Sequence, residues 1–360
     1  MNSSEAVTVH RRQPRCGVLL VNLGTPDAPT APAIRRYLRE FLSDRRVVES
    51  SRLIWLPILY AFILPFRPRK LAHTYREVWT TEGSPLLAIS QRQQRALQQA
   101  IGDEISVALA MRYGNPSITS ALEQLERQGV QRILVLPLYP QYSATTTAAV
   151  MDRVFDLVKQ RRWMPELRSI HQYHDDPRYI AALADSVQRH WQQQGRGDHL
   201  LMSFHSIPLS YFQAGDPYFC HCQKTARLLA ERLGLEDGQW SVAFQSRLGR
   251  LPWLQPYTEQ HVGRLAGKGV RQLDVICPGF SADCIETLEE IALRYAETFR
   301  EAGGTALRYI PALNDDPQHV AALQALIQRN LQGWGYEPLD PAEIDARLRR
   351  ASLISPIARE

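Results

Sequence analysis

Short apolar runs alternate with helical patterns along the whole chain. The runs predict strands at residues 17–23, 105–110, 132–138, 167–173, 199–204, 240–244, 272–277 and 307–310. They are continuous rather than alternating, which is typical of strands buried on both faces of a parallel sheet. Asn115-Pro116, Asp176-Pro177 and Asp316-Pro317 open helical stretches that Gly129, Gly195 and Gly333 close. The pattern therefore predicts an α/β fold.

Two stretches of the chain repeat each other. Residues 167–191 and 307–331 align without a gap at a shift of 140 residues, with 11 of 25 positions identical. We infer a duplicated strand–helix unit and expect two doubly wound domains with parallel sheets, each repeated helix packing on the opposite half. The first domain is predicted to comprise residues 16–175 and 316–360, and the second residues 176–315. Ligands bind at the carboxyl ends of such strands, so we expect a cleft between the domains.

Composition narrows the classes of protein that fit. The 360 residues are 44% hydrophobic and 22% charged, and the net charge is +5 without long Lys/Arg runs, so nothing demands nucleic acid. The first predicted strand is followed by no G-x-G-x-x-G and the chain contains no phosphate loop, which argues against a nicotinamide enzyme or an NTPase. Five cysteines without a secretory segment near Met1 indicate reduced thiols in a cytoplasmic protein.

One apolar segment raises the question of whether it spans a membrane. Residues 53–66 carry no charge, but they number 14, fewer than the roughly 20 that span a bilayer, and two prolines interrupt them. Arg52, Arg67, Arg69 and Lys70 flank the segment. Two interpretations stay open. It is either a buried helix or an exposed apolar lip with a basic rim, suited to a greasy acidic ligand or to a membrane surface.

Candidate chemistry gathers after two predicted strands. The strand 199–204 runs into His205, where sites of α/β proteins are built. After the strand 272–277, an expected α-helix places Glu286, Glu290 and Glu297 on one face at 100° per residue. Like charges one turn apart repel each other, and a bound divalent cation would relieve this repulsion. An imidazole together with carboxylates is suited to binding ferrous iron or to proton transfer. The alternative is a solvated face that starts with an Asp283–Glu286 capping box.

A second candidate is the run Cys220-His221-Cys222. A single C-x-C pair without a second pair is a weak metal motif compared with paired C-x-x-C motifs. The alternative interpretation is a pair of reduced thiols at the start of a helix.

At these residues the sequence resembles the ferrochelatase family. The resemblance covers nearly the whole chain, through residues 17–26 (GVLLVNLGTP), 139–143 (YPQYS), 203–208 (SFHSIP), 244–258 (FQSRLGRLPWLQPYT) and 277–290. It implies two similar Rossmann-like domains around a porphyrin cleft, insertion of ferrous iron into protoporphyrin IX to give protohaem, and no organic cofactor. It also implies that iron and porphyrin are substrates.

The resemblance also carries roles onto residues of this chain. His205 and Glu286 match the metal-handling pair and Glu290 continues the acidic row, so these three are the candidate catalytic residues. Which of His205 and Glu286 is base and which is iron ligand stays open. Residues 53–66 match the apolar lip of the pocket. The candidate porphyrin-binding residues are Arg67, Lys70, Tyr75, Ser84, Arg112, Tyr113, Trp253 and Phe280.

Two departures from the family pattern change the expectation. Animal members hold a [2Fe–2S] cluster through cysteines in a C-terminal extension and one after the Gln-Tyr-Ser motif. Here that position is Ala144 and no cysteine follows Cys284, so no [2Fe–2S] cluster is expected. Cys284 also replaces a histidine of some relatives, which puts any auxiliary role of that histidine in doubt.

Two other functions compete with this interpretation. One is a chelatase that loads coproporphyrin with iron, or another tetrapyrrole with a metal such as cobalt. The other is a carrier that binds haem or porphyrin without chemistry. Metal insertion by the purified protein separates the enzymes from the carrier, since all of them bind a tetrapyrrole.

Overall fold

The computed structural model describes residues 15–247, 249, 251–334, 340, 342–343, 345–346 and 349–350. Within them all eight predicted strands are present and form two four-stranded parallel sheets, which confirms the α/β class. The strands are β1 (Arg15–Thr25), β2 (Ile105–Gly114), β3 (Val130–Pro137), β4 (Glu166–Ser169), β5 (His199–His205), β6 (Trp240–Gln245), β7 (Gln272–Ile276) and β8 (Ala306–Ile310).

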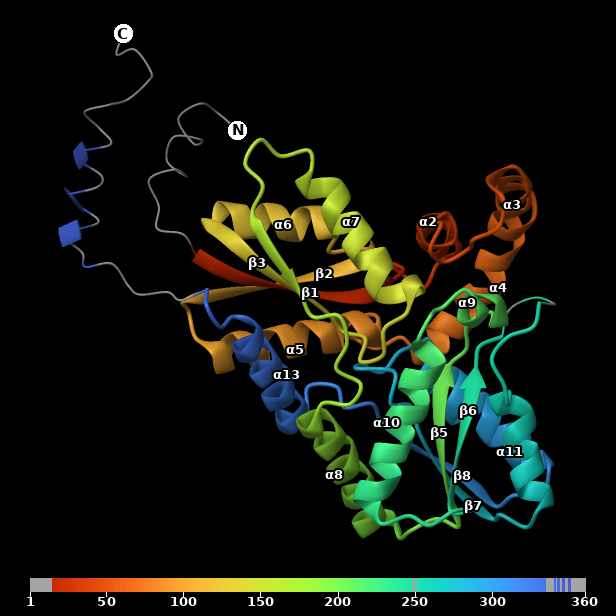
Figure 1. Cartoon of the computed structure of the whole chain (residues 1–360). Coiled ribbons are helices and arrows are strands. Elements are labelled where there is room, and N and C mark those ends of the chain that lie inside the picture. Colours follow the sequence, from red (N-terminus) through yellow and green to blue (C-terminus); the bar gives the residue numbers. More distant parts are fainter. Residues whose placement is uncertain are drawn as a thin grey trace.

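The two sheets have the same topology. Their strand orders are β2-β1-β3-β4 and β6-β5-β7-β8, so β1 and β5 hold equivalent inner places (Figure 1). Inner strands are covered on both faces, as the continuous apolar runs predict. In β1 the side chains of Val18, Leu19, Leu20 and Val21 are fully buried. Each such burial stabilises the fold by about 1.5–3 kcal/mol.

Helices connect the strands and cover the sheets. They are α2 (Ala31–Leu42), α3 (Arg52–Ile58), α4 (Leu64–Val78), α5 (Pro85–Ile101), α6 (Ile118–Arg127), α7 (Ala149–Val158), α8 (Pro177–Gln194), α9 (Leu209–Gln213), α10 (Tyr218–Leu233), α11 (Thr258–Gly267), α12 (Ala296–Glu301) and α13 (Pro317–Asn330). The described part of the chain also contains three π-helical segments, η1 (Leu59–Ile63), η2 (Ala144–Ala148) and η3 (Glu286–Tyr295). The predicted Asp-Pro starts are confirmed, because the Asp176 and Asp316 side chains cap α8 and α13. The helix predicted to close at Gly333 ends earlier, at Asn330.

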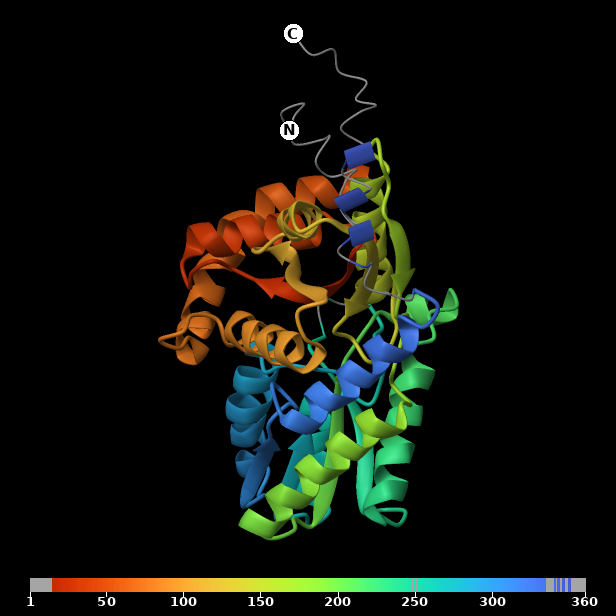
Figure 2. The same cartoon turned by 90° about the vertical axis from the view of Figure 1, so that its left-hand side faces the viewer.

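The repeated units exchange their helices. α8 follows β4 of the first sheet but packs against α10 of the second half, and α13 follows β8 but packs against α5 of the first half. The two helices also lie side by side (Figure 2), where the rings of Tyr179 and His319, equivalent residues of the repeat, are 6.2 Å apart. One apolar core therefore contains residues of both sheets, among them Leu20 and Met202.

The domain division at residues 175/176 and 315/316 stays a prediction. The exchanged helices favour it, because α13 lies with the first half. Residues 335–339 and 351–360 of the predicted first domain lie outside the described residues.

Most of the apolar segment 53–66 is exposed, and only Leu59 and Leu64 of it are buried. It spans α3, η1 and the start of α4; no residue of α3 is buried, and Leu53, Phe62 and Phe66 keep 88%, 66% and 69% of their surface exposed. The buried-helix interpretation is therefore wrong, and the exposed-lip interpretation agrees with the structure. Among the described residues, no helix is both long and apolar enough to cross a bilayer.

Gly24, at the end of β1, occupies a position where a side chain has no room. Its φ is +114°, and a Cβ atom there would lie 1.7 Å from the Tyr113 carbonyl oxygen of the paired strand. We expect Gly24→Ala to lower the free energy of unfolding by more than about 3 kcal/mol, through backbone strain and overpacking together. The check is the urea midpoint of the purified variant.

Gly102→Ala is the matched control for this prediction. Gly102 also has a positive φ, +87°, but an added Cβ would meet nothing within 4 Å. The expected cost is the strain alone, about 1–2 kcal/mol. Equal losses in the two variants would contradict the close approach of β1 and β2 at Gly24.

Candidate active site

His205 is the last residue of β5, and its ring is held in one tautomer. The Nδ1 atom lies 2.6 Å from the Ser206 carbonyl oxygen. A carbonyl oxygen only accepts hydrogen bonds, so Nδ1 carries the proton and the neutral ring keeps its lone pair on Nε2. The residue is half-buried. Nε2 is thus available as a base or as a metal ligand.

Gln245 joins His205 to the segment that carries Glu286. It lies opposite His205 in the β5–β6 pair, and its carbonyl oxygen accepts from the Ser206 N–H at 2.8 Å. Its side-chain Nε2 donates to the Glu286 carbonyl oxygen at 2.8 Å, and its Oε1 accepts from Ser203 Oγ at the same distance. A single glutamine, 1% exposed, therefore fixes the two candidate residues relative to each other.

The helix that carries the carboxylates is not the α-helix we predicted. Residues Glu286–Tyr295 form the π-helix η3, with i→i+5 hydrogen bonds and a wider turn, so an angle of 100° per residue does not apply. Glu290 is buried, whereas Glu297 lies beyond η3 in α12 and is exposed. The predicted single acidic face is therefore wrong at Glu297.

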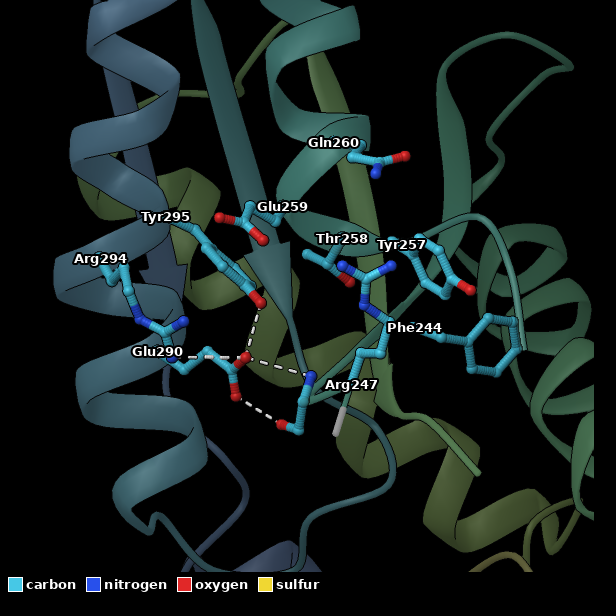
Figure 3. Close-up of a pocket in the computed structure, with 10 residues that line it drawn as sticks. Phe244, Arg247, Tyr257, Thr258, Glu259, Gln260, Glu290, Arg294 and Tyr295 are labelled. Carbon is cyan, nitrogen blue, oxygen red and sulfur yellow. Dashed lines mark hydrogen bonds and ion pairs between the residues drawn. The ribbon is translucent and has the colours of Figure 1, made fainter. Parts of the chain in front are cut away.

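Both oxygens of the Glu290 carboxylate accept hydrogen bonds. Its Oε1 accepts from the Tyr295 hydroxyl at 2.6 Å and from the Ser246 N–H at 3.1 Å, and its Oε2 accepts from Ser246 Oγ (Figure 3). The Arg294 guanidinium lies 3.4 Å from Oε1 and also pairs with Glu289. The Arg294 guanidinium therefore supplies positive charge beside the Glu290 carboxylate.

A cavity of about 110 Å³ adjoins this carboxylate. Arg247, which also faces the cavity, stacks over the Tyr257 ring at 4.7 Å. Burial, and next the Glu290 charge, raise the pKa of the Tyr295 phenol, so the phenol stays protonated and donates. The lining residues are Phe244, Ser246, Arg247, Tyr257, Thr258, Glu259, Gln260, Glu290, Arg294 and Tyr295.

Glu286 has different surroundings. It is half-buried, and η3 packs against α4 on this side. Burial and then the Glu286 charge raise the pKa of the Tyr75 phenol well above its ordinary value. Burial raises the pKa of the Cys284 thiol first and Glu286 raises it further, so this thiol stays neutral and is a poor metal ligand.

Asp283 does not form the predicted capping box. Its Oδ1 accepts from the Tyr309 hydroxyl at 2.6 Å and from Thr287 Oγ1 at 2.9 Å, and its Oδ2 accepts from Asn314 Nδ2 at 2.7 Å. The Asp283 carboxylate thus links η3 to the end of β8 and the residues that follow it. Among the described residues, no three His, Cys, Asp or Glu side chains are grouped closely enough to hold a metal ion.

Four candidate porphyrin residues lie near the carboxyl ends of the inner strands. Ser84 precedes α5 and its Oγ lies 2.8 Å from Thr25 Oγ1 at the end of β1. Phe280, just after β7, packs against the α5 residues Leu86 and Ile89. Trp253 pairs with Pro208, three residues beyond His205, and its buried indole N–H has no partner in the described structure. Tyr75 adjoins Glu286, as described above.

The other four candidates lie elsewhere. Arg67 and Lys70 are exposed on α4, beside the apolar lip. Arg112 forms an ion pair with Asp44, and the fully buried Tyr113 donates to the same carboxylate at 2.8 Å. Arg112 and Tyr113 therefore form contacts within the first half of the chain, and Tyr113 has no exposed surface that a ligand could contact.

The residues of the Cys-His-Cys run do not converge. They lie in the first turns of α10, where Cys220 is exposed and Cys222 is fully buried. The His221 ring stacks on the His174 ring at 3.9 Å, and its Nδ1 accepts from the Tyr142 N–H at 3.3 Å. These contacts favour the interpretation as reduced thiols at the start of a helix.

Comparison with known proteins decides the family. A family model described as Ferrochelatase matches residues 15–331. The chain belongs to the ferrochelatase family. Ferrochelatase from Marinobacter nauticus is 51% identical over 342 residues, which cover 94% of this chain and 92% of that protein. Ferrochelatase from Thioalkalivibrio sulfidiphilus is 54% identical over 322 residues, covering 88% and 87%.

A more distant likeness concerns the fold alone. The sirohydrochlorin chelatase SirB from Bacillus subtilis subspecies spizizenii, solved in complex with cobalt, superposes with a TM-score of 0.52 at 11% identity. The superposition covers 88% of this chain and 95% of that one. The two-sheet architecture of the ferrochelatase chain is thus shared with a chelatase of very different sequence.

Proposed function

We propose that the chain inserts ferrous iron into protoporphyrin IX, forming protohaem and releasing two protons. The family match across residues 15–331 and the relatives named Ferrochelatase support the activity. The observation that carries the mechanism is His205 Nε2, which keeps its lone pair because Nδ1 donates to the Ser206 carbonyl oxygen. Gln245 links the backbone beside His205 to the backbone of Glu286. Iron is a substrate here, and the reaction needs no organic cofactor.

The chemistry assigns His205 and Glu286 complementary roles. Two pyrrole N–H protons leave as one Fe²⁺ enters, so charge balances when both protons reach acceptors. An imidazole lone pair and a carboxylate are suited to accept a proton or to bind Fe²⁺ near neutral pH. One of the pair acts as the base and passes the two pyrrole protons, one after the other, to solvent water, while the other holds the metal. We propose that Glu290 contributes by holding Ser246 and Tyr295, since its oxygens are already occupied.

The remaining residues are proposed to hold the ring. Trp253 and Phe280 provide aromatic walls that favour a bent macrocycle, whose pyrrole lone pair points at the metal. Arg67 and Lys70 supply positive charge for the two propionates, and Tyr75 and Ser84 line the inner end. Arg112 and Tyr113 are proposed to act indirectly, by holding Asp44, and Arg112 also donates to the Ala149 carbonyl oxygen at 2.7 Å.

A direct assay tests the proposed function. The purified chain is mixed anaerobically with protoporphyrin IX and Fe²⁺, or with Zn²⁺ as a surrogate, and the absorbance band of the metalloporphyrin is followed. Turnover is expected with protoporphyrin IX. A higher kcat/KM with coproporphyrin would favour the other chelatase, and porphyrin binding without insertion would favour the carrier.

We also propose a cytoplasmic protein that touches anionic membrane surfaces through residues 53–66. The lip exposes Leu53, Phe62 and Phe66, and Arg67 and Lys70 lie beside it. Exposed apolar side chains with a basic rim match the interface of an anionic bilayer. The joint change Phe62→Ser and Phe66→Ser is expected to lower partitioning onto phosphatidylserine vesicles at least about 10-fold.

The matched control for the lip is Phe155→Ser. Phe155 lies on α7 and is 50% exposed, so the change removes the exposed surface of one phenylalanine, against two in the lip variant, at another place. Co-sedimentation with vesicles measures both variants, at low and at high salt. Equal losses in the two variants, or binding that ignores lipid charge, would contradict contact through the lip.

A further inference from the structure

Asn314 adopts a backbone conformation that few residues with a side chain adopt. Its φ is +49°, and among the described residues other than glycine only Ser246 also has a positive φ. Asn tolerates this left-handed region better than most residues. It follows β8 and belongs to the second copy of the repeat, where His174 holds the equivalent place in the first copy. Such a conformation persists where surrounding contacts hold it.

The side chain of Asn314 forms a reciprocal pair with Asp283. The Asn314 Nδ2 donates to Asp283 Oδ2 at 2.7 Å, and the Asp283 N–H donates to Asn314 Oδ1 at 2.8 Å. Asp283 is only 6% exposed, so both bonds act in a largely water-free place. Hydrogen bonds to a buried carboxylate are stronger than those between neutral groups.

The backbone of Asn314 is held from two further elements. Its carbonyl oxygen accepts from Gln93 Nε2 of α5 at 2.9 Å and from His319 Nδ1 of α13 at 2.7 Å. Gln93 and His319 are both fully buried. Gln93 Nε2 also donates to the Ser281 carbonyl oxygen at 2.8 Å, just before η3. Asn314 is thus a buried junction of α5, α13 and the start of η3.

The junction continues to Glu286. Thr287 Oγ1 donates to Asp283 Oδ1 at 2.9 Å and accepts from the Cys284 N–H at 3.0 Å. Glu286 lies between these residues in the chain, and Gln245 holds its carbonyl oxygen from the other side. The direction of the Glu286 side chain is therefore determined by a turn that Asp283 closes and Asn314 orients.

We propose that Asn314 is a positioning residue for Glu286, acting through Asp283 and Thr287. The proposal rests on the function proposed above, in which Glu286 handles iron or a proton. The lip, Trp253 and the basic residues of α4 are outside this set of contacts. Loss of Asn314 therefore changes metal insertion without changing the affinity for the porphyrin.

Three variants test the proposal. Asn314→Gly keeps the positive φ and removes both side-chain bonds. Asn314→Asp places two carboxylates against each other. The double variant Asp283→Asn with Asn314→Asp, called the exchange variant, restores the pair. The amide donor then stands at position 283 and the carboxylate acceptor at position 314. In that exchange the amide oxygen takes the place of Asp283 Oδ1, which accepts from Thr287, Tyr309 and Ala312 in the parent chain.

The variants are expected to change metal insertion much more than porphyrin binding. In Asn314→Gly, kcat falls about 10- to 100-fold and the KM for iron rises, while the Kd for protoporphyrin changes less than about 2-fold. In Asn314→Asp, kcat is lower still and recovers as the pH falls, because a shared proton replaces the lost donor. The exchange variant returns kcat to within about 3-fold of the parent chain.

A second comparison separates positioning from general loss of structure. In a Glu286→Gln background, Asn314→Gly is expected to lower kcat no further, because its effect passes through Glu286. Thermal unfolding and porphyrin fluorescence show that each variant is folded.

Two outcomes would overturn the proposal. One is a folded Asn314→Gly chain with the parent's kcat, and the other is a folded exchange variant that recovers nothing. Full activity of Glu286→Gln alone would instead overturn the function proposed for Glu286.

Discussion

His205→Ala is expected to lower kcat for iron insertion by about 10²- to 10⁴-fold, the usual contribution of a positioned acid–base group. The change removes the imidazole at the end of β5. Its Nε2 atom has a free lone pair, since the hydrogen bond to the Ser206 carbonyl oxygen keeps the proton on Nδ1. The Kd for protoporphyrin, measured by fluorescence quenching, is expected to change little. Initial rates under anaerobic conditions, with Fe²⁺ and with Zn²⁺, measure the effect.

His73→Ala provides the comparison for this variant. His73 lies on α4, near the lip, and its exposed side chain pairs with Glu77 at 3.1 Å. Its activity should equal that of the parent chain. A His205→Ala chain with unchanged turnover would remove His205 from the mechanism and leave the family assignment intact.

Glu286→Gln is expected to lower kcat by about 10²- to 10³-fold and to raise the KM for iron, because an amide neither accepts the proton nor binds Fe²⁺ as a carboxylate does. The side chain keeps its size, and the Gln245 bond to the Glu286 carbonyl oxygen is unaffected, so the fold should persist. Titrating iron at fixed protoporphyrin, and protoporphyrin at fixed iron, separates the two KM values.

Glu289→Gln is the matched control on the same helix. Glu289 is the next carboxylate along η3, separated from Glu286 by Thr287 and Leu288, and it pairs with Arg294 at 3.3 Å. We expect a small change in stability and none in the KM for iron. Equal kinetic losses at both glutamates would indicate a general effect of charge rather than a site at Glu286.

The strands and the starts of α8 and α13 could be predicted because their signals are local. Residues such as Val18 to Val21 lie on an inner strand buried on both faces, so the apolar run is read directly as a strand. The gapless repeat contains Asp176 and Asp316, whose side chains cap α8 and α13. Neither prediction needs a contact between residues far apart in the chain.

The candidate site was predictable only in part. Motifs identify His205 and Glu286, but periodicity assumes an α-helix, and the π-helix η3 separates Glu290 from Glu297. The hydrogen bond of Tyr113 to Asp44 joins residues that are 69 positions apart, and no local pattern reveals it. The same holds for Asn314 and Asp283, 31 residues apart, whose pairing is visible only in the folded chain.

Gln245 illustrates a signal that could have been found. It stands in the segment 244–258 that carries the family resemblance, directly after the predicted strand 240–244. A polar residue at the carboxyl end of a buried strand is a candidate for a site, as at His205. Its role in joining two strands and η3 needed the register of β5 and β6.

The equal topology of the two sheets contrasts with the unequal segments that follow their inner strands. After β1 the chain adds α2, α3, η1 and α4 before α5, and so builds the lip, whereas β5 ends at His205 and leads through the short α9 to α10. In the function proposed above, the first unit supplies the lip and the basic residues of α4, whereas the second supplies His205, Glu286 and the aromatic side chains of Trp253 and Phe280. Changes in the lip would then alter how the tetrapyrrole is bound, and changes around His205 and Glu286 would alter how the metal is handled. Chimeric chains that exchange residues 26–84 between relatives would show how far the preference for a tetrapyrrole follows the segment that contains the lip.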